Sequence, residues 1–243
     1  MSGFGRLYGV GLGPGDPELL TLKAARIIGM VPVIAYFAKL GRRGHARTIV
    51  ESFLKPEHQL LPMYYPVTTE VHFEDAEYVS QLSQFYAEQA ALIAAQLEAG
   101  RDVAVLSEGD PLFYGSFMHL YERLRGRFGV TIIPGVTGMA GCWGAAGLSM
   151  TWGDDILSVL PGTLDAAALA QRLKSTDAAV IMKLGKNFTK VRAAVVEAGL
   201  LSGAYYVERG AMAGEKVTPL KDKIDGVAPY FSMILIPGQG RRP

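Results

Sequence analysis

Residues 7–18 read Leu-Tyr-Gly-Val-Gly-Leu-Gly-Pro-Gly-Asp-Pro-Glu, and this stretch decides the fold. The apolar run Leu7–Val10 predicts a buried strand, which a glycine-rich loop follows. Apolar residues then recur at near-helical spacing over Glu18–Ile28, and we expect Asp16 to cap this helix. A second apolar run at Val31–Tyr36 completes a strand–helix–strand unit, which is typical of a parallel sheet.

The alternation of strands and helices continues along the chain and predicts two α/β domains, each with a mainly parallel or mixed sheet flanked by helices. The first domain should add three strands, at Gln59–Met63, Val103–Ser107 and Val130–Ile133. A long helix should lie between the first two of these, at Glu77–Ala99. A glycine-rich helix over Thr137–Ala146 should precede the strands of the second domain, at Ile156–Leu160, Ala178–Met182, Tyr205–Glu208 and Phe231–Ile236. We place the domains at residues 1–148 and 149–243, with the boundary within Leu148–Asp154.

Composition excludes several classes of protein. Of the 243 residues, 49% are hydrophobic, which is ample for a packed core, and the net charge of +1 disfavours nucleic acid as a partner. Cys142 is the only cysteine, so there is no intrachain disulfide and the cytoplasm is the expected location. Met1–Arg6 lacks a signal-peptide pattern. Phe128–Gly153 is uncharged over 26 residues, but Pro134 and seven glycines interrupt it, so we expect no membrane association.

Three glycine-containing loops follow predicted strands, at Gly9–Pro17, Ser107–Gly115 and Pro134–Gly138. The first is not a dinucleotide fingerprint, because Pro14 or Asp16 stands where a third glycine is required. Each loop alone is also explained by a tight turn before a capped helix. Because the carboxyl ends of parallel strands meet at one edge of a sheet, the two loops that contain Gly-Asp-Pro favour a shared ligand crevice there.

Other residues give weaker signals. The four histidines show no metal-ligand spacing, and Cys142 has no adjacent base, so neither a metal site nor covalent catalysis is expected. The basic loop Gly41–Arg47 is either a solvated loop or a contact for ligand carboxylates. Several aromatic residues either line a pocket for a flat ligand or belong to the core: Tyr64, Tyr65, Tyr114, Trp143 and Trp152.

The segment Gly-Leu-Gly-Pro-Gly-Asp-Pro-Glu-Leu-Leu-Thr-Leu-Lys-Ala (11–24) resembles the opening motif of the tetrapyrrole methylase family of S-adenosylmethionine-dependent enzymes. Glu-Gly-Asp-Pro-Leu-Phe-Tyr-Gly-Ser-Phe (108–117) is most similar to the branch that methylates C20 of precorrin-2. Three further segments extend the resemblance over nearly the whole chain: Pro134–Gly138, Val207–Met212 and Pro229–Ile236.

The resemblance implies a two-domain α/β homodimer that binds S-adenosylmethionine in the interdomain cleft and transfers its methyl group to C20 of precorrin-2 or cobalt-precorrin-2. The implied cofactor-binding residues are Pro14, Glu108, Gly109, Asp110, Phe113, Thr137, Gly138, Met182 and Gly210. A polycarboxylate substrate favours Arg42, Arg43, Arg47 and Tyr114 as its contacts.

The catalytic residue that accepts the displaced C20 proton is not identified; Glu108, Tyr114 and His119 are candidates because they lie in or near the second loop. Alternatives are another acceptor within the family, such as uroporphyrinogen III, the diphthamide or ribosomal RNA branches, and a tetrapyrrole-binding module without turnover. Near-neutral charge weighs against RNA.

Overall fold

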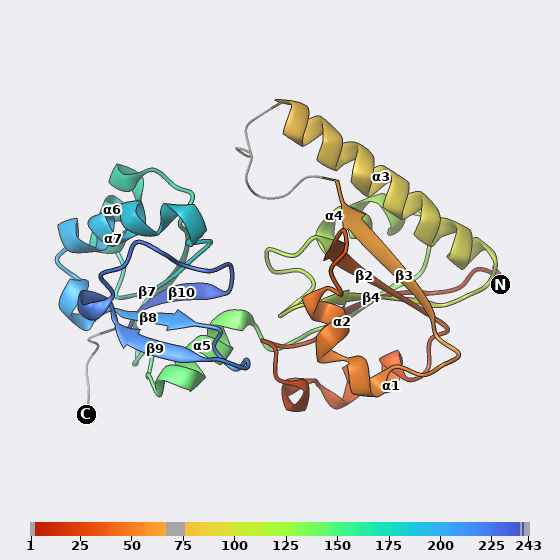
Figure 1. The fold of residues 1–243 in the computed structure, drawn as a ribbon, viewed down its shortest axis with the longest axis horizontal. Coiled ribbons are helices and arrows are strands. Elements are labelled where there is room, and N and C mark those ends of the chain that lie inside the picture. The colour runs from red at the N-terminus through yellow and green to blue at the C-terminus, as the bar shows by residue number, and fades with distance from the viewer. Residues whose placement is uncertain (1–2, 67–75, 239, 241–243) are drawn as a thin grey trace. The chain divides into compact units, whose positions relative to one another are not determined.

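The computed structural model describes residues 3–66, 76–238 and 240 (Figure 1). The chain divides into two compact units, residues 1–137 and 138–243. Each unit has one five-stranded sheet; the sequence predicts the five strands of the first unit and four of the five in the second.

The first unit has a parallel sheet in the order β3-β2-β4-β1-β5. Its strands are β1 (Leu7–Gly11), β2 (Val33–Lys39), β3 (Gln59–Tyr65), β4 (Val103–Ser107) and β5 (Val130–Ile133). Its helices are α1 (Leu22–Ile28), α2 (His45–Ile49), α3 (Ala76–Glu98) and α4 (Phe117–Leu124), with 3-10 turns at Pro17–Leu19 and Glu51–Phe53.

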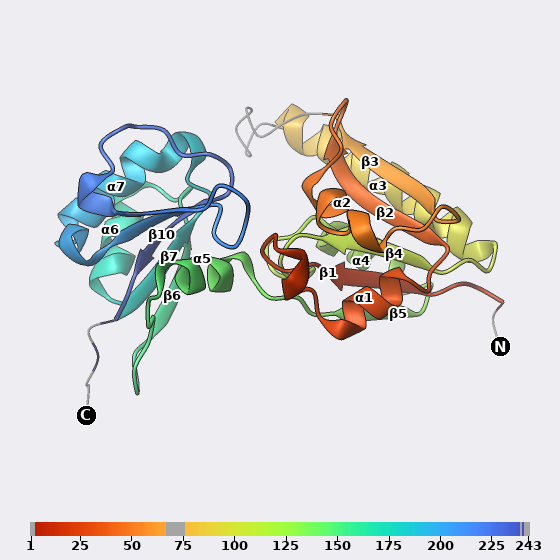
Figure 2. The same ribbon diagram turned by 60° about the horizontal axis from the view of Figure 1, so that its bottom comes forward.

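Alternate strand residues of the first unit build two cores, because successive side chains point to opposite faces of a sheet. Leu7 and Val105 pack on the face covered by α3 and α4. Tyr8 and Val10 pack on the face covered by α1 and α2. Figure 2 shows the two pairs of helices on opposite faces. Both faces are buried, which explains why these strands are continuous apolar runs in the sequence.

The start of the first helix differs from the prediction. Asp16 caps only the 3-10 turn, where its side chain accepts a hydrogen bond from the Glu18 amide at 2.9 Å. The N-cap of α1 is Thr21, whose hydroxyl accepts a bond from the Ala24 amide at 3.1 Å. The prediction that Asp16 caps this helix was therefore wrong, because a second capping residue lies five positions further on and the extended Leu20 separates the two turns.

The second unit has a mixed sheet in the order β6-β7-β10-β8-β9, in which only β6 and β7 pair in parallel. Its strands are β6 (Leu157–Pro161), β7 (Ala178–Met182), β8 (Tyr205–Glu208), β9 (Lys216–Pro219) and β10 (Ser232–Ile236). Its helices are α5 (Gly138–Ala146), α6 (Ala166–Lys174) and α7 (Phe188–Glu197), with 3-10 turns at Gly185–Asn187, Leu201–Gly203 and Leu220–Asp222. Helices α6 and α7 cover one face and α5 the other.

Helix α5 belongs to the second unit, whereas we expected it at the end of the first domain. Its buried Cys142 packs with Val180, Val207 and Leu235 of the second sheet. The units therefore divide after Thr137, earlier than the boundary expected within Leu148–Asp154. No helix in the described ranges is both long and apolar enough to cross a membrane, and Phe128–Gly153 contains β5, the turn after it and α5.

Candidate functional site

The carboxyl edge of the first sheet contains a topological switch point between β1 and β4. These strands are neighbours, but the chain leaves β1 towards β2 on one side and leaves β4 towards β5 on the other. Open α/β sheets bind ligands in the crevice at such a point. The loops after β1, β4 and β5 all begin at this edge.

The three predicted loops meet through their glycines. The amide of Gly109 donates to the carbonyl oxygen of Gly13 at 2.7 Å, and the amide of Gly13 donates back at 3.3 Å. A Cβ placed on Gly135 would lie 2.1 Å from the Gly109 oxygen and 2.8 Å from the carbonyl carbon of Gly11. Only glycine fits so close to two other backbones. The structure therefore brings together all three loops that the sequence singles out.

The carboxylate of Asp110 ties the second loop to the third. Its Oδ2 accepts a hydrogen bond from the Gly135 amide at 3.1 Å, and its Oδ1 accepts one from the Leu112 amide at 2.9 Å. Both carboxylate oxygens thus accept hydrogen bonds from backbone amides. The carboxylate therefore fixes the loop and is not left open to bind a cation.

Glu108 makes a contact that the sequence did not suggest. Its Oε1 accepts a hydrogen bond from the amide of Ala46 in the first turn of α2, at 2.9 Å. Part of the residue is exposed to solvent. Desolvation of its carboxylate is the largest effect and raises the pKa of Glu108, whereas the charge of His45 and the hydrogen bond from the Ala46 amide act to lower that pKa.

The other two proton-acceptor candidates lie on or beside α4. Tyr114 is 46% exposed, has a left-handed backbone (φ 54°) and packs edge-on against Phe113. His119 stacks on Tyr86 with ring centroids 4.2 Å apart, and desolvation, then the charge of Arg123, lower its pKa. The ring of His119 therefore packs against α3 through Tyr86, although the residue is exposed and does not belong to the first core.

The basic loop contains arginines in different environments. Arg42 is exposed, and Arg43 and Arg47 both approach Glu51, with nitrogen–oxygen distances of 3.5 and 3.8 Å. The Nε of Arg47 is buried and has no hydrogen-bond partner among the described residues. Of these three arginines, Arg47 is the one that lies within α2 and is partly buried.

A network of hydroxyl groups went unpredicted. The hydroxyl oxygens of Tyr65 and Ser116 are 2.5 Å apart, and the Tyr86 hydroxyl donates to Ser116 at 3.1 Å. This network links the end of β3 and helix α3 to the start of α4. The partners are 51 and 30 residues from Ser116, so no local pattern signals them.

The second unit holds the remaining predicted cofactor residues. Met182 ends β7 and Gly210 follows β8, and both lie at one sheet edge because β7 and β8 each run antiparallel to β10. A Cβ on Gly210 would lie 2.6 Å from the Cα of Cys142, so the turn after β8 packs directly on α5. Gly138 opens α5, and Thr137 is the last residue of the first unit.

Backbone strain marks the same edge of the second sheet. Lys183 follows Met182, and Arg209 and Ala211 flank Gly210; all three have φ between 54° and 58°. Such left-handed non-glycine residues cluster at functional sites. The Ala211 amide donates to Oε2 of Glu215 at 2.7 Å, which stabilises the strained turn and which no sequence signal indicated.

Cys142 has no features of a nucleophile. Burial raises the pKa of its thiol to about 11, so the thiol stays protonated at neutral pH. Among the described residues, no group of three or more histidine, cysteine, aspartate or glutamate side chains could hold a metal ion.

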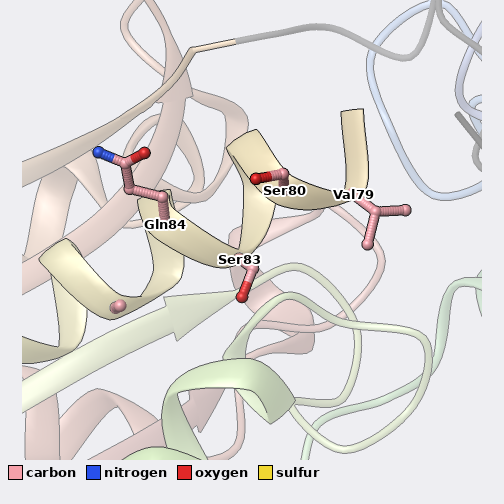
Figure 3. A pocket seen from close by; sticks show the side chains of 5 residues that line it. Val79, Ser80, Ser83 and Gln84 are labelled. Atoms are coloured by element: carbon pink, nitrogen blue, oxygen red, sulfur yellow. The ribbon is translucent and has the colours of Figure 1, made fainter. Parts of the chain in front are cut away.

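Two hollows are lined by residues outside the three loops. One, of about 600 Å³, runs along α3 and is lined by Val79, Ser80, Ser83, Gln84 and Ala87 (Figure 3). The other, of about 380 Å³, lies in the second unit beside Trp152 and Tyr205. Neither contains a predicted cofactor or substrate residue. Tyr64, Tyr65 and Tyr114 belong to the first unit, and Trp143 and Trp152 belong to the second.

Comparisons with known proteins agree with the fold and the loops. The model of the Tetrapyrrole (Corrin/Porphyrin) Methylases matches residues 6–223. The chain is 57% identical over 241 residues to the Precorrin-2 C(20)-methyltransferase of Sinorhizobium sp, covering 99% of this chain and 98% of that one. It is 30% identical to the Cobalt-precorrin-2 C(20)-methyltransferase of Salmonella typhimurium, covering 96% of each. The structure of Uroporphyrin-III C-methyl transferase from Thermus thermophilus complexed with S-adenyl homocysteine superposes with a TM-score of 0.65 at 23% identity, covering 97% of this chain and 98% of that one.

The chain belongs to the tetrapyrrole methylase family. Within that family, its likeness over nearly the full length is to enzymes named for methylation of C20 in precorrin-2 or its cobalt form. The family resemblance and the fold class inferred from the sequence are both confirmed.

Proposed function

We propose that this protein transfers a methyl group from S-adenosylmethionine to C20 of precorrin-2 in cobalamin biosynthesis. The 57% identity to a relative of that name supports the acceptor. The observation that carries the proposal in the structure is the backbone junction of Gly11, Gly109 and Gly135 at the switch point of the first sheet.

The residues present fit the proposed cofactor. Glycines let the loops after β1, β4 and β5 pack backbone against backbone at the carboxyl edge of the first sheet, which is where open α/β sheets bind ligands. The proposed contacts are Pro14, Glu108, Gly109, Asp110, Phe113, Thr137, Gly138, Met182 and Gly210. Glu108 would contribute its main chain, because its carboxylate is bonded to α2, and Asp110 would act by fixing the loop. These residues come from both units.

When bound, S-adenosylmethionine supplies an activated methyl group on its sulfonium. The protein's task is then to hold the acceptor carbon in line with that group and away from water. A proton must also leave C20. Glu108, Tyr114 and His119 remain the proposed acceptors from sequence, of which His119 is stacked on Tyr86 and Glu108 is bonded to Ala46.

Replacing Asp110 with alanine should raise the Kd for S-adenosylhomocysteine by roughly tenfold or more, because the Gly135 and Leu112 amides lose their acceptor. Asp110→Asn retains one carbonyl oxygen and should fall between alanine and wild type. Isothermal titration calorimetry measures the affinity, and thermal unfolding measures stability. An Asp110→Ala protein that loses stability but keeps full affinity would show that this loop junction does not serve the cofactor.

The arginines of the basic loop are the proposed contacts for substrate carboxylates, together with Tyr114. Arg47→Ala should raise the KM for precorrin-2 by roughly tenfold, because a guanidinium that binds a carboxylate has no substitute there. Arg42→Ala should raise the KM less, because Arg42 is exposed. Fixing an exposed, long side chain in one position costs entropy, which offsets part of its interaction with a carboxylate. Steady-state kinetics at saturating S-adenosylmethionine distinguish them. Unchanged KM in both variants, and in Arg43→Ala, would remove the basic loop from the substrate site.

The choice of acceptor is tested by comparing initial rates with precorrin-2, cobalt-precorrin-2 and uroporphyrinogen III under anaerobic conditions. We expect methylation of precorrin-2 or its cobalt complex, and the preferred form assigns the pathway. Faster methylation of uroporphyrinogen III would establish the alternative acceptor. Micromolar binding of S-adenosylhomocysteine without transfer to any of the three would contradict this acceptor. A protein that binds a tetrapyrrole but neither binds S-adenosylhomocysteine nor transfers a methyl group would favour the non-catalytic module. Homodimer formation, which the family resemblance implies, and a cytoplasmic location, which the single cysteine favours, stay predictions.

A further inference from the structure

Helix α2 has no cap of its own. It begins at His45 after Gly44, whose backbone (φ 78°, ψ 138°) is outside the helical region and which has no side chain to accept a hydrogen bond. The first amides of a helix need acceptors from elsewhere. Glu108, at the end of β4 and 62 residues away, supplies one to Ala46.

Helix α2 in turn holds Arg47. Ala46 and Ile49 are buried in the core beneath the helix, so the helix is anchored to the sheet. The side chain of Arg47 is only 24% exposed, and its one described ion pair is the long contact to Glu51. A guanidinium has five N–H donors, so Arg47 keeps donors for a ligand.

The residues that follow Glu108 fix the loops at the same sheet edge. Gly109 pairs with Gly13 of the first loop, and Asp110 bonds to Gly135 of the third. Three consecutive residues therefore connect α2, the first loop and the third loop. Any displacement of Glu108 changes the position of Arg47 relative to these loops.

We infer that Glu108 is a positioning residue, which acts through α2 to hold Arg47 where it binds a carboxylate of the polycarboxylate tetrapyrrole substrate. The inference rests on the proposed function. It gives Glu108 a role that differs from that of a cofactor contact and from that of a proton acceptor. Glutamine keeps an oxygen that can accept the Ala46 hydrogen bond, and alanine does not. A positioning role therefore predicts rescue by the conservative variant.

The test compares Glu108→Gln, Glu108→Ala and a control, Glu57→Ala, an exposed residue of the turn before β3 at the opposite edge of the sheet. Four quantities are measured: the Kd for S-adenosylhomocysteine by calorimetry, the Kd for uroporphyrin by its fluorescence, and kcat and KM for precorrin-2. Glu108→Ala should raise KM and the uroporphyrin Kd by roughly tenfold, as expected for a lost helix cap, and leave kcat and the S-adenosylhomocysteine Kd within about twofold. Glu108→Gln should stay within about threefold of wild type in every quantity. Glu57→Ala should match wild type.

Combining Glu108→Ala with Arg47→Ala provides an independent check. If Glu108 acts through Arg47, the double variant should bind uroporphyrin no more weakly than Arg47→Ala alone. Additive losses would overturn the inference. So would loss of kcat in Glu108→Gln at unchanged KM, which marks a proton acceptor, or loss of S-adenosylhomocysteine binding alone, which marks a cofactor contact. If the wild type binds uroporphyrin in this Glu108-dependent way but does not methylate precorrin-2, the inference stands and the proposed function fails.

Discussion

A Gly135→Ala protein should lose binding of S-adenosylhomocysteine and about 3 kcal/mol of stability, the upper range for overpacking a rigid site. The new Cβ would lie 2.1 Å from the Gly109 oxygen and 2.8 Å from the Gly11 carbonyl carbon. Both neighbours are backbone atoms, and Gly109 is held by its paired hydrogen bonds to Gly13. No side chain can rotate away, so the loops must separate.

Gly126→Ala is the matched control in the same unit. A Cβ at Gly126 meets no atom within 4 Å, and its φ lies outside the left-handed range. We expect stability within about 0.5 kcal/mol of wild type and unchanged affinity, as for most surface substitutions. Chemical denaturation and calorimetry measure both variants. A Gly135→Ala protein with wild-type affinity would contradict the assignment of this junction to the cofactor site.

Gly210→Ala should be the corresponding substitution in the second unit. Its Cβ would lie 2.6 Å from the Cα and 2.9 Å from the amide nitrogen of Cys142, both in the backbone of α5. The turn is already strained at Arg209 and Ala211 and is held by Glu215, so it has little freedom to move. We expect a loss of about 2–3 kcal/mol of stability and an S-adenosylhomocysteine Kd raised at least roughly tenfold.

Gly203→Ala is the control for this substitution, because a Cβ at Gly203 has no neighbour within 4 Å and its φ is ordinary. It should leave affinity unchanged. Thermal unfolding and calorimetry on both proteins give the comparison. If Gly210→Ala loses stability to the extent expected but binds S-adenosylhomocysteine as wild type does, Gly210 belongs to the packing of α5 and not to the cofactor site.

The strands could be predicted from sequence where both faces of the strand are buried. Four are found at the predicted bounds, since each is a short apolar run that ends at a polar residue, glycine or proline: Val103–Ser107, Val130–Ile133, Ala178–Met182 and Tyr205–Glu208. Strand β9 (Lys216–Pro219) was missed because it lies at the edge of the sheet and most of its residues are exposed. Such a strand lacks the apolar pattern on which the prediction depends.

The domain boundary illustrates a different limit. Helix α5 is rich in glycine and alanine, so its sequence has no apolar stripe that shows which sheet it packs on. The closeness of Gly210 to Cys142, which joins α5 to the second unit, is a contact between residues far apart in the chain.

The candidate site was predictable to the level of its loops. Glycines at strand ends indicated all three, and acidic residues accompany them in the first two, because that pattern depends on local sequence. The connections among the loops depend on pairs distant in sequence, such as Glu108 with Ala46 and Asp110 with Gly135, and these required the structure. Consequently the two acids, which the sequence offered as ligand contacts, have carboxylates that bond the protein's own backbone.

The most direct test of the central claim is anaerobic incubation with precorrin-2 and S-adenosylmethionine labelled with carbon-13 in its methyl group, followed by NMR of the product. We predict a single labelled methyl group, attached to C20. A labelled methyl group at any other carbon, or no transfer by protein that binds S-adenosylhomocysteine tightly, would contradict the proposed reaction.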